Sequence, residues 1–95
     1  DSTYAEKGIL TGEIYDEAGA PVSRARVSFK SAANSSDTLQ TVRSNREGVF
    51  VKTLIPPGRW NVEIAAAGYR TVLFDTIELK KGDHLRRTIT MRPGK

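Results

Sequence analysis

The residue types that could carry out catalysis are few in this sequence and do not form a catalytic arrangement. His84 is the only histidine, and cysteine is absent. A serine nucleophile needs a histidine or comparable base beside it, and a histidine or thiolate metal site needs several such donors. His84 lies in the segment Gly82-Asp83-His84, whose composition favours a solvated turn. We therefore predict no catalytic residue and no enzymatic activity.

Carboxylates could do a second kind of chemistry, as calcium ligands. Asp16, Glu17 and Asp37 all lie in segments that we expect to be turns. A calcium loop carries acidic residues at alternating positions of one short segment, and these three do not form such a series. We interpret them as solvated turn residues, and we predict neither a metal site nor a cofactor.

Two aromatic residues could contact a carbohydrate, because sugars stack on exposed rings. Trp60 and Tyr69 are the candidates for this contact. Trp60 also follows the inward side of an expected strand, where its ring would belong to the hydrophobic core. Carbohydrate binding is therefore the alternative function, behind a role in protein interaction.

Basic residues offer the other candidate surface. Fifteen lysines and arginines against eleven acidic residues give a formal net charge of +4. Arg24, Arg26 and Lys30 alternate along one expected strand, so their side chains share its outward face, which could meet an acidic protein or remain solvated. Arg86 and Arg87 either extend this surface or protect an edge strand from pairing. Aromatic residues are not interleaved with the basic ones, so we do not expect nucleic-acid binding.

Short segments rich in turn-forming residues divide the chain at regular intervals, which is typical of an all-β sandwich. We expect one domain over residues 8–93, with an N-terminal extension or linker at 1–7 and a tail at 94–95. We expect a seven-stranded antiparallel Greek-key sandwich, in which one strand is anchored by Phe50 and the other six span residues 8–15, 24–30, 38–44, 59–66, 71–79 and 85–91.

Alternation of apolar and polar residues predicts which side chains face inward. The expected core consists of Ile14, Ala25, Val27, Phe29, Phe50, Trp60, Val62, Ile64, Ile77 and Leu79. Two places break the alternation. Leu39 and Val42 lie on opposite faces of their strand unless a bulge intervenes. Lys52 lies where an apolar residue is expected, so either this strand is bulged or Val51 takes the inward role.

Six short motifs occur in an order that resembles the carboxypeptidase regulatory-like domain, a transthyretin-like sandwich. They are residues 12–16, residues 19–27, residues 44–50, residues 55–62, Ala67-Gly68-Tyr69 and Ile77-Glu78-Leu79. The structural positions within them are Gly12, Gly19, Gly48, Phe50, Gly58 and Gly68. Gly19 and Gly48 are expected at positive φ, and Pro57-Gly58 is expected to form a turn.

The resemblance implies an accessory module in a secreted, periplasmic or surface protein, whose partners are neighbouring domains or another protein. Related enzymes that hydrolyse a purine-breakdown intermediate depend on several histidines and a C-terminal Tyr-Arg-Gly-Ser. This sequence ends Met91-Arg92-Pro93-Gly94-Lys95, so we do not expect that activity. Its apolar runs are far shorter than the roughly 20 residues of a membrane-spanning helix. We expect an extracytoplasmic domain that does not itself cross a membrane.

Overall fold

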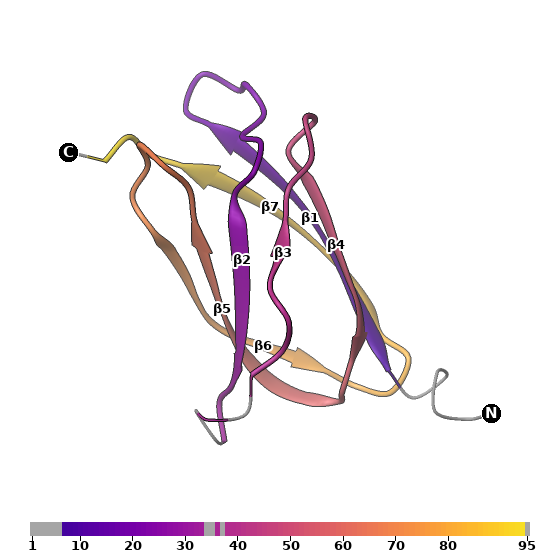
Figure 1. Ribbon diagram of the computed structural model, residues 1–95. Coiled ribbons are helices and arrows are strands. Elements are labelled where there is room, and N and C mark those ends of the chain that lie inside the picture. The colour runs from indigo at the N-terminus through magenta and orange to yellow at the C-terminus, as the bar shows by residue number, and fades with distance from the viewer. Residues whose placement is uncertain (1–6, 34–35, 37, 95) are drawn as a thin grey trace.

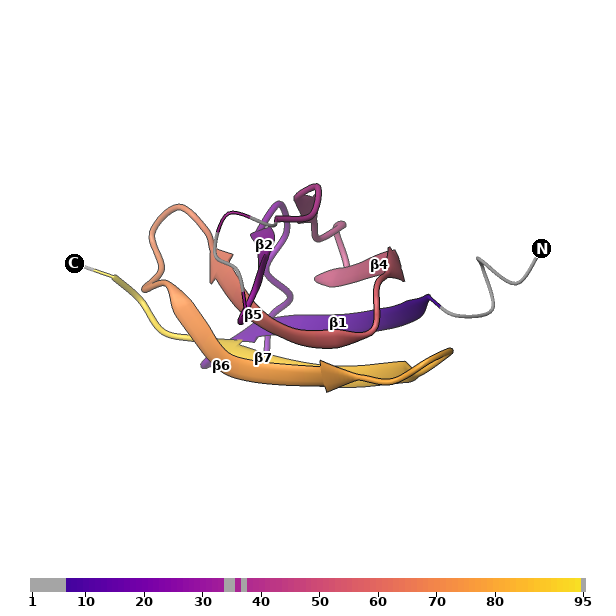
Figure 2. The ribbon, with the colours of Figure 1, turned by 90° about the horizontal axis from the view of Figure 1, so that it is seen from below.

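The computed structural model describes residues 7–33, 36 and 38–94, and these residues form two β-sheets. One sheet has the strand order β4-β1-β7 and the other β3-β2-β5-β6 (Figures 1 and 2). The strands are β1 (Gly8–Asp16), β2 (Arg26–Ser31), β3 (Val42–Arg43), β4 (Val49–Ile55), β5 (Gly58–Ala65), β6 (Val72–Leu79) and β7 (His84–Met91). The all-β sandwich class is confirmed, and the Greek-key connectivity stays a prediction.

The core lies between the sheets and is built largely by alternation of inward and outward residues along the strands. In β1, Leu10, Gly12 and Ile14 are buried while the residues between them are partly exposed. All ten residues of the expected core are buried, at 5% exposure or less. The core also includes Leu10, Val22, Ile55, Ile89 and Met91. Among the described residues no buried side-chain nitrogen or oxygen lacks a hydrogen-bond partner.

The pairing of β1 with β7 is parallel, so the expectation of a wholly antiparallel sandwich is wrong for this pair. The other strand pairs of the two sheets are antiparallel. Alternation along a strand shows which face is buried, but it carries no information about the direction of the neighbouring strand. β1 and β7 come from the two ends of the domain sequence, so no short hairpin between them imposes antiparallel pairing.

A bulge in β4 explains the position of Lys52. Between the Lys52 and Ile55 pairings, three residue steps on β4 face two steps on β1. Leu54 lies inside this bulge with φ of 58°. The extra residue shifts the alternation so that Ile55 is buried, while Val51 stays 50% exposed. Of the two interpretations left open by the sequence, the bulged strand is therefore the one that the structure shows.

The segment before β3 contains a similar irregularity. Thr38 pairs with Lys30, and Val42 pairs with Val27, so four residue steps on one strand face three on the other. As a result Leu39 and Val42 both pack against the core. The regular strand here is the two-residue β3, which is shorter than the expected strand over 38–44 because the irregularity interrupts the ladder.

Two glycines are required by close approaches in the three-stranded sheet. Gly12 pairs with Phe50 across β1 and β4, and a Cβ at this position would overlap the Cε2 and Cζ atoms of the phenylalanine ring. Gly48 has φ of 76° and lies against the backbone oxygen of Ile14. Positive φ also occurs at the other turn glycines that the sequence marked, Gly19, Gly58 and Gly68.

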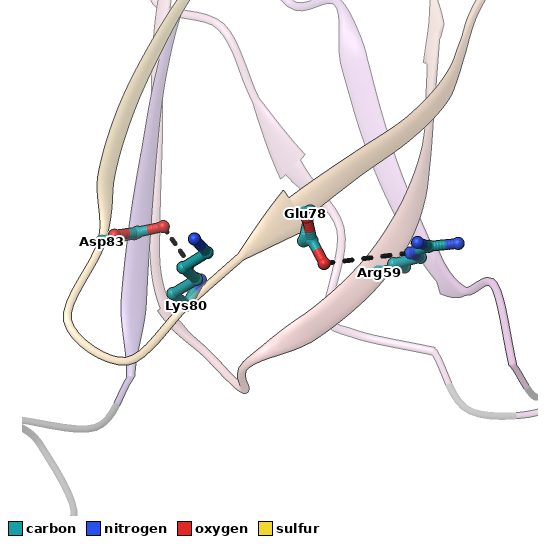
Figure 3. Close-up of polar contacts among 4 residues, drawn as sticks. All are labelled: Arg59, Glu78, Lys80 and Asp83. Atoms are coloured by element: carbon teal, nitrogen blue, oxygen red, sulfur yellow. Dashed lines mark hydrogen bonds and ion pairs between the residues drawn. The ribbon is translucent and has the colours of Figure 1, made fainter.

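The turn between β6 and β7 is held by Asp83 (Figure 3). Its Oδ2 accepts a hydrogen bond of 2.9 Å from the backbone N–H of Lys80, and its own N–H donates to the carbonyl of Lys80 at 3.1 Å. Beside this turn Arg59 and Glu78 form a 4.0 Å ion pair on β5 and β6, and both side chains are more than 60% exposed. The turn is thus fixed by one side-chain and one backbone hydrogen bond of Asp83, with an exposed ion pair next to it.

Candidate interaction surface

The outer face of the four-stranded sheet carries the predicted basic residues of β2. Arg26 and Lys30 are exposed and two alternations apart on the strand. Arg26 lies between Arg43 of β3 and Ala65 of β5 in the register of the sheet. Arg24 is exposed in the segment that leads into β2. We call Arg24, Arg26, Lys30 and Arg43 the basic face.

Three of these residues surround a shallow depression at one end of the sheet, with a volume of about 620 Å³. Its lining consists of Val22, Ser23, Arg24, Arg26, Arg43, Ala65, Ala66, Ala67 and Tyr69. Lys30 lies outside it, in the lining of a second hollow with Glu63 and Leu73. The sequence predicted Arg24 and Arg26 on one outward face and Tyr69 as a separate glycan candidate, and the fold brings all three together with Arg43.

Sequence reasoning missed Arg43. The only available signal was its place in the expected strand over 38–44, in alternation with the apolar Val42. The irregularity before β3 shifts the register in a way that alternation alone does not reveal, and that register puts Arg43 opposite Arg26.

Arg24 is held in place by a buried serine. Its φ is 59°, a left-handed conformation that is uncommon outside glycine. Ser44 is 5% exposed, and its hydroxyl donates to the Val22 carbonyl at 2.7 Å while accepting from the Ala25 N–H at 2.9 Å. The Arg24 N–H donates to the Ser44 carbonyl at 3.0 Å. These bonds join the segment before β2 to the end of β3, so Arg24 is fixed beside Arg43.

The charge of the depression is uncompensated. Its lining contains three arginines and no carboxylate. Among the described residues, Arg59 pairs with Glu78 and Arg92 pairs with Glu17, and neither ion pair includes an arginine of the depression. The depression therefore combines positive charge from the β2 and β3 side with alanine and tyrosine from the end of β5 and the chain after it.

Arg86 and Arg87 do not extend the basic face, so that part of the predicted surface is wrong. They lie on β7, an edge strand of the other sheet. Their side chains alternate between the two faces of β7, and Arg87 Nη1 donates to the Arg86 carbonyl at 2.8 Å. A charged residue on the inward side of an edge strand disfavours pairing with a further strand, which fits the edge-protecting alternative.

Trp60 is not available to a glycan, and the alternative prediction is wrong for this residue. Its side chain is 4% exposed in the core, and Nε1 donates to the Pro56 carbonyl at 2.9 Å. The ring has no free face because the inward alternation of β5 directs it between the sheets. Tyr69 is partly exposed at the depression and packs in part against the core.

The acidic candidates have turn roles where they are described. Asp16 Oδ1 accepts from the N–H groups of Ala18 and Ala20, both at 2.9 Å. Asp37 lies outside the described residues. Over residues 7–33, 36 and 38–94, the structure contains no group of three or more histidine, aspartate or glutamate residues that could hold a metal ion. His84 is exposed at the start of β7.

Two facing sheets, a closed apolar core and turns fixed by glycine define a small β-sandwich domain. The family model of the carboxypeptidase regulatory-like domain matches residues 9–92, and the chain belongs to this family. A comparison with curated proteins finds no match. Among the described residues, no helix has the length and apolar character needed to span a membrane.

Solved structures confirm the fold at low sequence identity. The Bacillus anthracis TIE protein superimposes with a TM-score of 0.73 at 17% identity, over 90% of this chain and 16% of that one. A streptococcal ancillary pilin gives 0.72 at 15% identity, over 93% and 33%. Klebsiella pneumoniae 5-hydroxyisourate hydrolase gives 0.67 at 18% identity, over 93% and 87%. The chain thus spans a third or less of the first two proteins.

Proposed function

We propose that this domain is a non-catalytic accessory module of a larger extracytoplasmic protein, and that it makes protein contacts through its basic face. Membership of the carboxypeptidase regulatory-like family supports the accessory role. Similar domains in the TIE protein and the ancillary pilin make up only part of much longer chains, which supports a modular context. Shared fold alone does not transmit function, so the argument for contact depends on the surface itself.

The observation that carries the proposal is the uncompensated cluster of Arg24, Arg26 and Arg43. A solvated basic surface usually mixes both signs of charge, whereas this depression has no carboxylate in its lining. Charge of one sign on a surface directs association with partners of the opposite sign. A pure spacer would not need such a cluster, so we favour interaction over a spacer role.

The other functions weighed from the sequence have less support. Carbohydrate binding would depend on exposed rings, and Trp60 is in the core. Catalysis would depend on an acid, base or nucleophile, and the one histidine, His84, lies on the opposite sheet from the depression. We propose that nucleic acid is not the partner, because the depression offers one tyrosine rather than a series of stacking rings.

Hydrogen exchange of the full-length parent protein tests this proposal. If the basic face contacts a neighbouring domain, amides of residues 22–26 and 65–69 exchange more slowly in the parent protein than in the isolated domain. The variant Arg24→Glu/Arg26→Glu loses that protection, and the variant Arg86→Glu/Arg87→Glu, with the same change of charge on the other sheet, keeps it. If these amides exchange at equal rates in the parent protein and the isolated domain, and the domain also binds no separate protein, the domain is a spacer and the proposal is wrong.

A further inference from the structure

We infer that the depression around Arg24, Arg26 and Arg43 is a preformed site for the carboxylate of an acidic peptide segment that also carries an apolar side chain. This inference rests on the proposed function, since it names the chemistry of the partner at the same face. It is drawn from the placement of like charges, the strained backbone at Arg24 and the two-sided lining of the depression.

Two arginines face each other across neighbouring strands at the depression. Arg26 and Arg43 lie directly opposite each other on antiparallel β2 and β3, and both side chains are exposed. Like charges in this cross-strand position destabilise a sheet. No described carboxylate pairs with either side chain to offset the repulsion. An anion bound between the two guanidinium groups would offset this repulsion. Without a bound anion the repulsion between the two arginines persists.

A third arginine, Arg24, also lines the depression. Arg24 adds a further positive charge to the same rim and holds a left-handed backbone conformation, which is unfavourable for an L-residue. Glycine would occupy this position without strain. The two hydrogen bonds of the Ser44 hydroxyl keep the neighbouring backbone fixed. The backbone that carries Arg24 is therefore positioned before any ligand arrives, which lowers the entropy lost on binding.

The lining of the depression indicates the chemistry of its ligand, because it has a charged side and an apolar side. Guanidinium groups bind carboxylate through paired N–H donors in one plane. The other side of the depression is apolar, with three consecutive alanines from Ala65 to Ala67 and the ring of Tyr69. Small alanine side chains leave room for an apolar residue of the ligand beside its carboxylate. The volume of about 620 Å³ is in the usual range of ligand sites.

A peptide fits these features better than a polyanion. Nucleic acids and sulfated glycans are contacted along a track of basic residues with little apolar surface. Here three arginines converge on one hollow, and the next hollow along the sheet already contains Glu63. A short segment with one or two carboxylates matches a localised charge of this kind.

An NMR titration of the isolated domain tests the site. The probe is an N-acetylated, C-amidated pentapeptide with two glutamates flanking a phenylalanine, and its control replaces both glutamates by glutamine. We expect a dissociation constant on the order of 1 mM or tighter at low salt, with shifts concentrated at Arg26, Arg43 and Ala66. The glutamine peptide should bind roughly tenfold more weakly.

Variants and two other anions complete the test. Arg43→Glu should weaken the glutamate peptide by roughly fivefold or more, whereas Arg86→Glu, with the same charge change on the other sheet, should alter affinity by less than about twofold. Equal binding of the two peptides would overturn the inference. So would tighter binding of a heparin-derived hexasaccharide or inorganic phosphate, with shifts spread across both sheets, since either result indicates general attraction of anions.

The two proposals fail separately. If the pentapeptide does not bind but Arg24→Glu/Arg26→Glu still removes exchange protection in the parent protein, the basic face contacts a folded partner and the peptide site is wrong. If the pentapeptide binds at the depression but the parent protein shows no protection there, the site stands, and the contact with a neighbouring domain is wrong.

Discussion

Replacing Gly12 by alanine should destabilise the domain far more than one added methyl group would suggest. The new Cβ would overlap two ring atoms of Phe50, and even the third nearest, Cδ2, lies only 2.9 Å away. The ring is 2% exposed, and β1 is the central strand of its sheet, so neither side can move aside easily. Overpacking typically costs about 1–3 kcal/mol, and we place Gly12→Ala at about 3 kcal/mol or above.

That loss is a large share of the stability of a 95-residue domain, which at about 0.05–0.15 kcal/mol per residue is about 5–14 kcal/mol. Urea unfolding followed by the fluorescence of Trp60, the single tryptophan and a core residue, measures it. With a urea dependence of about 1–1.5 kcal/mol/M, the midpoint should fall by about 2–3 M.

Two further variants show whether the phenylalanine ring is the cause. Gly8→Ala makes the same change on the same strand, but its closest contact is 3.0 Å from Cδ2 of Leu79, the end of a flexible side chain, and should cost less than about 1 kcal/mol. Gly12→Ala should lower the free energy of unfolding by about 1–2 kcal/mol less when it is made in the Phe50→Leu variant than when it is made in the wild type, because the shorter side chain leaves room for the new Cβ. A Gly12→Ala midpoint within about 0.3 M of wild type, or strict additivity with Phe50→Leu, would refute this reasoning.

Three more comparisons use the same urea assay. Gly48→Ala adds a Cβ against a backbone oxygen at φ of 76° and should lower the free energy of unfolding by about 3 kcal/mol or more. Gly19→Ala, at φ of 85° with open space around it, should lower it by about 1–2 kcal/mol. Equal losses of stability would contradict the role of the close contact. Ser44→Ala leaves a buried N–H and carbonyl without the hydroxyl and should cost about 2–3 kcal/mol, so a loss under about 0.5 kcal/mol would count against its joining role. Asp83→Ala should cost about 1 kcal/mol through the lost turn hydrogen bond. Glu78→Gln, in an exposed ion pair, should change stability by less than about 0.5 kcal/mol. A larger loss in Glu78→Gln than in Asp83→Ala would contradict the conclusion that the turn hydrogen bond, and not the exposed ion pair, stabilises this end of the domain.

The sequence predicted the buried faces well because burial follows a period of two in strands. Alternation along 24–30 and 59–66 places Phe29 and Trp60 in the core, and both are there. Strand direction and bulges have no such periodic signal. The parallel neighbour of β1 and the bulge at Leu54 depend on contacts between distant segments, which one sequence does not encode locally.

The candidate site was predicted only in pieces for the same reason. Arg24 and Arg26 are close in the sequence. The exposure of Arg26 follows from the alternation of β2, whereas Arg24 lies before that strand in a left-handed conformation. Arg43 and Tyr69 reach the same depression from other segments, and their convergence depends on the register of β3 and on the chain after β5. Arg86, in contrast, shares the charge of these residues but lies on the other sheet, so composition alone could not separate the two groups.

Ser44 connects the stability of the fold to the geometry of the site. It is buried, and it lies between exposed Arg43 and the turn that leads to β4. Its hydroxyl holds the segment that carries Arg24, and its carbonyl accepts from the Arg24 N–H, so the backbone of Arg24 is fixed by the residue that follows Arg43. Replacing it would change the spacing of the charges without changing their number. The depression is therefore better described as a consequence of how β2 and β3 are joined than as a chance gathering of surface arginines.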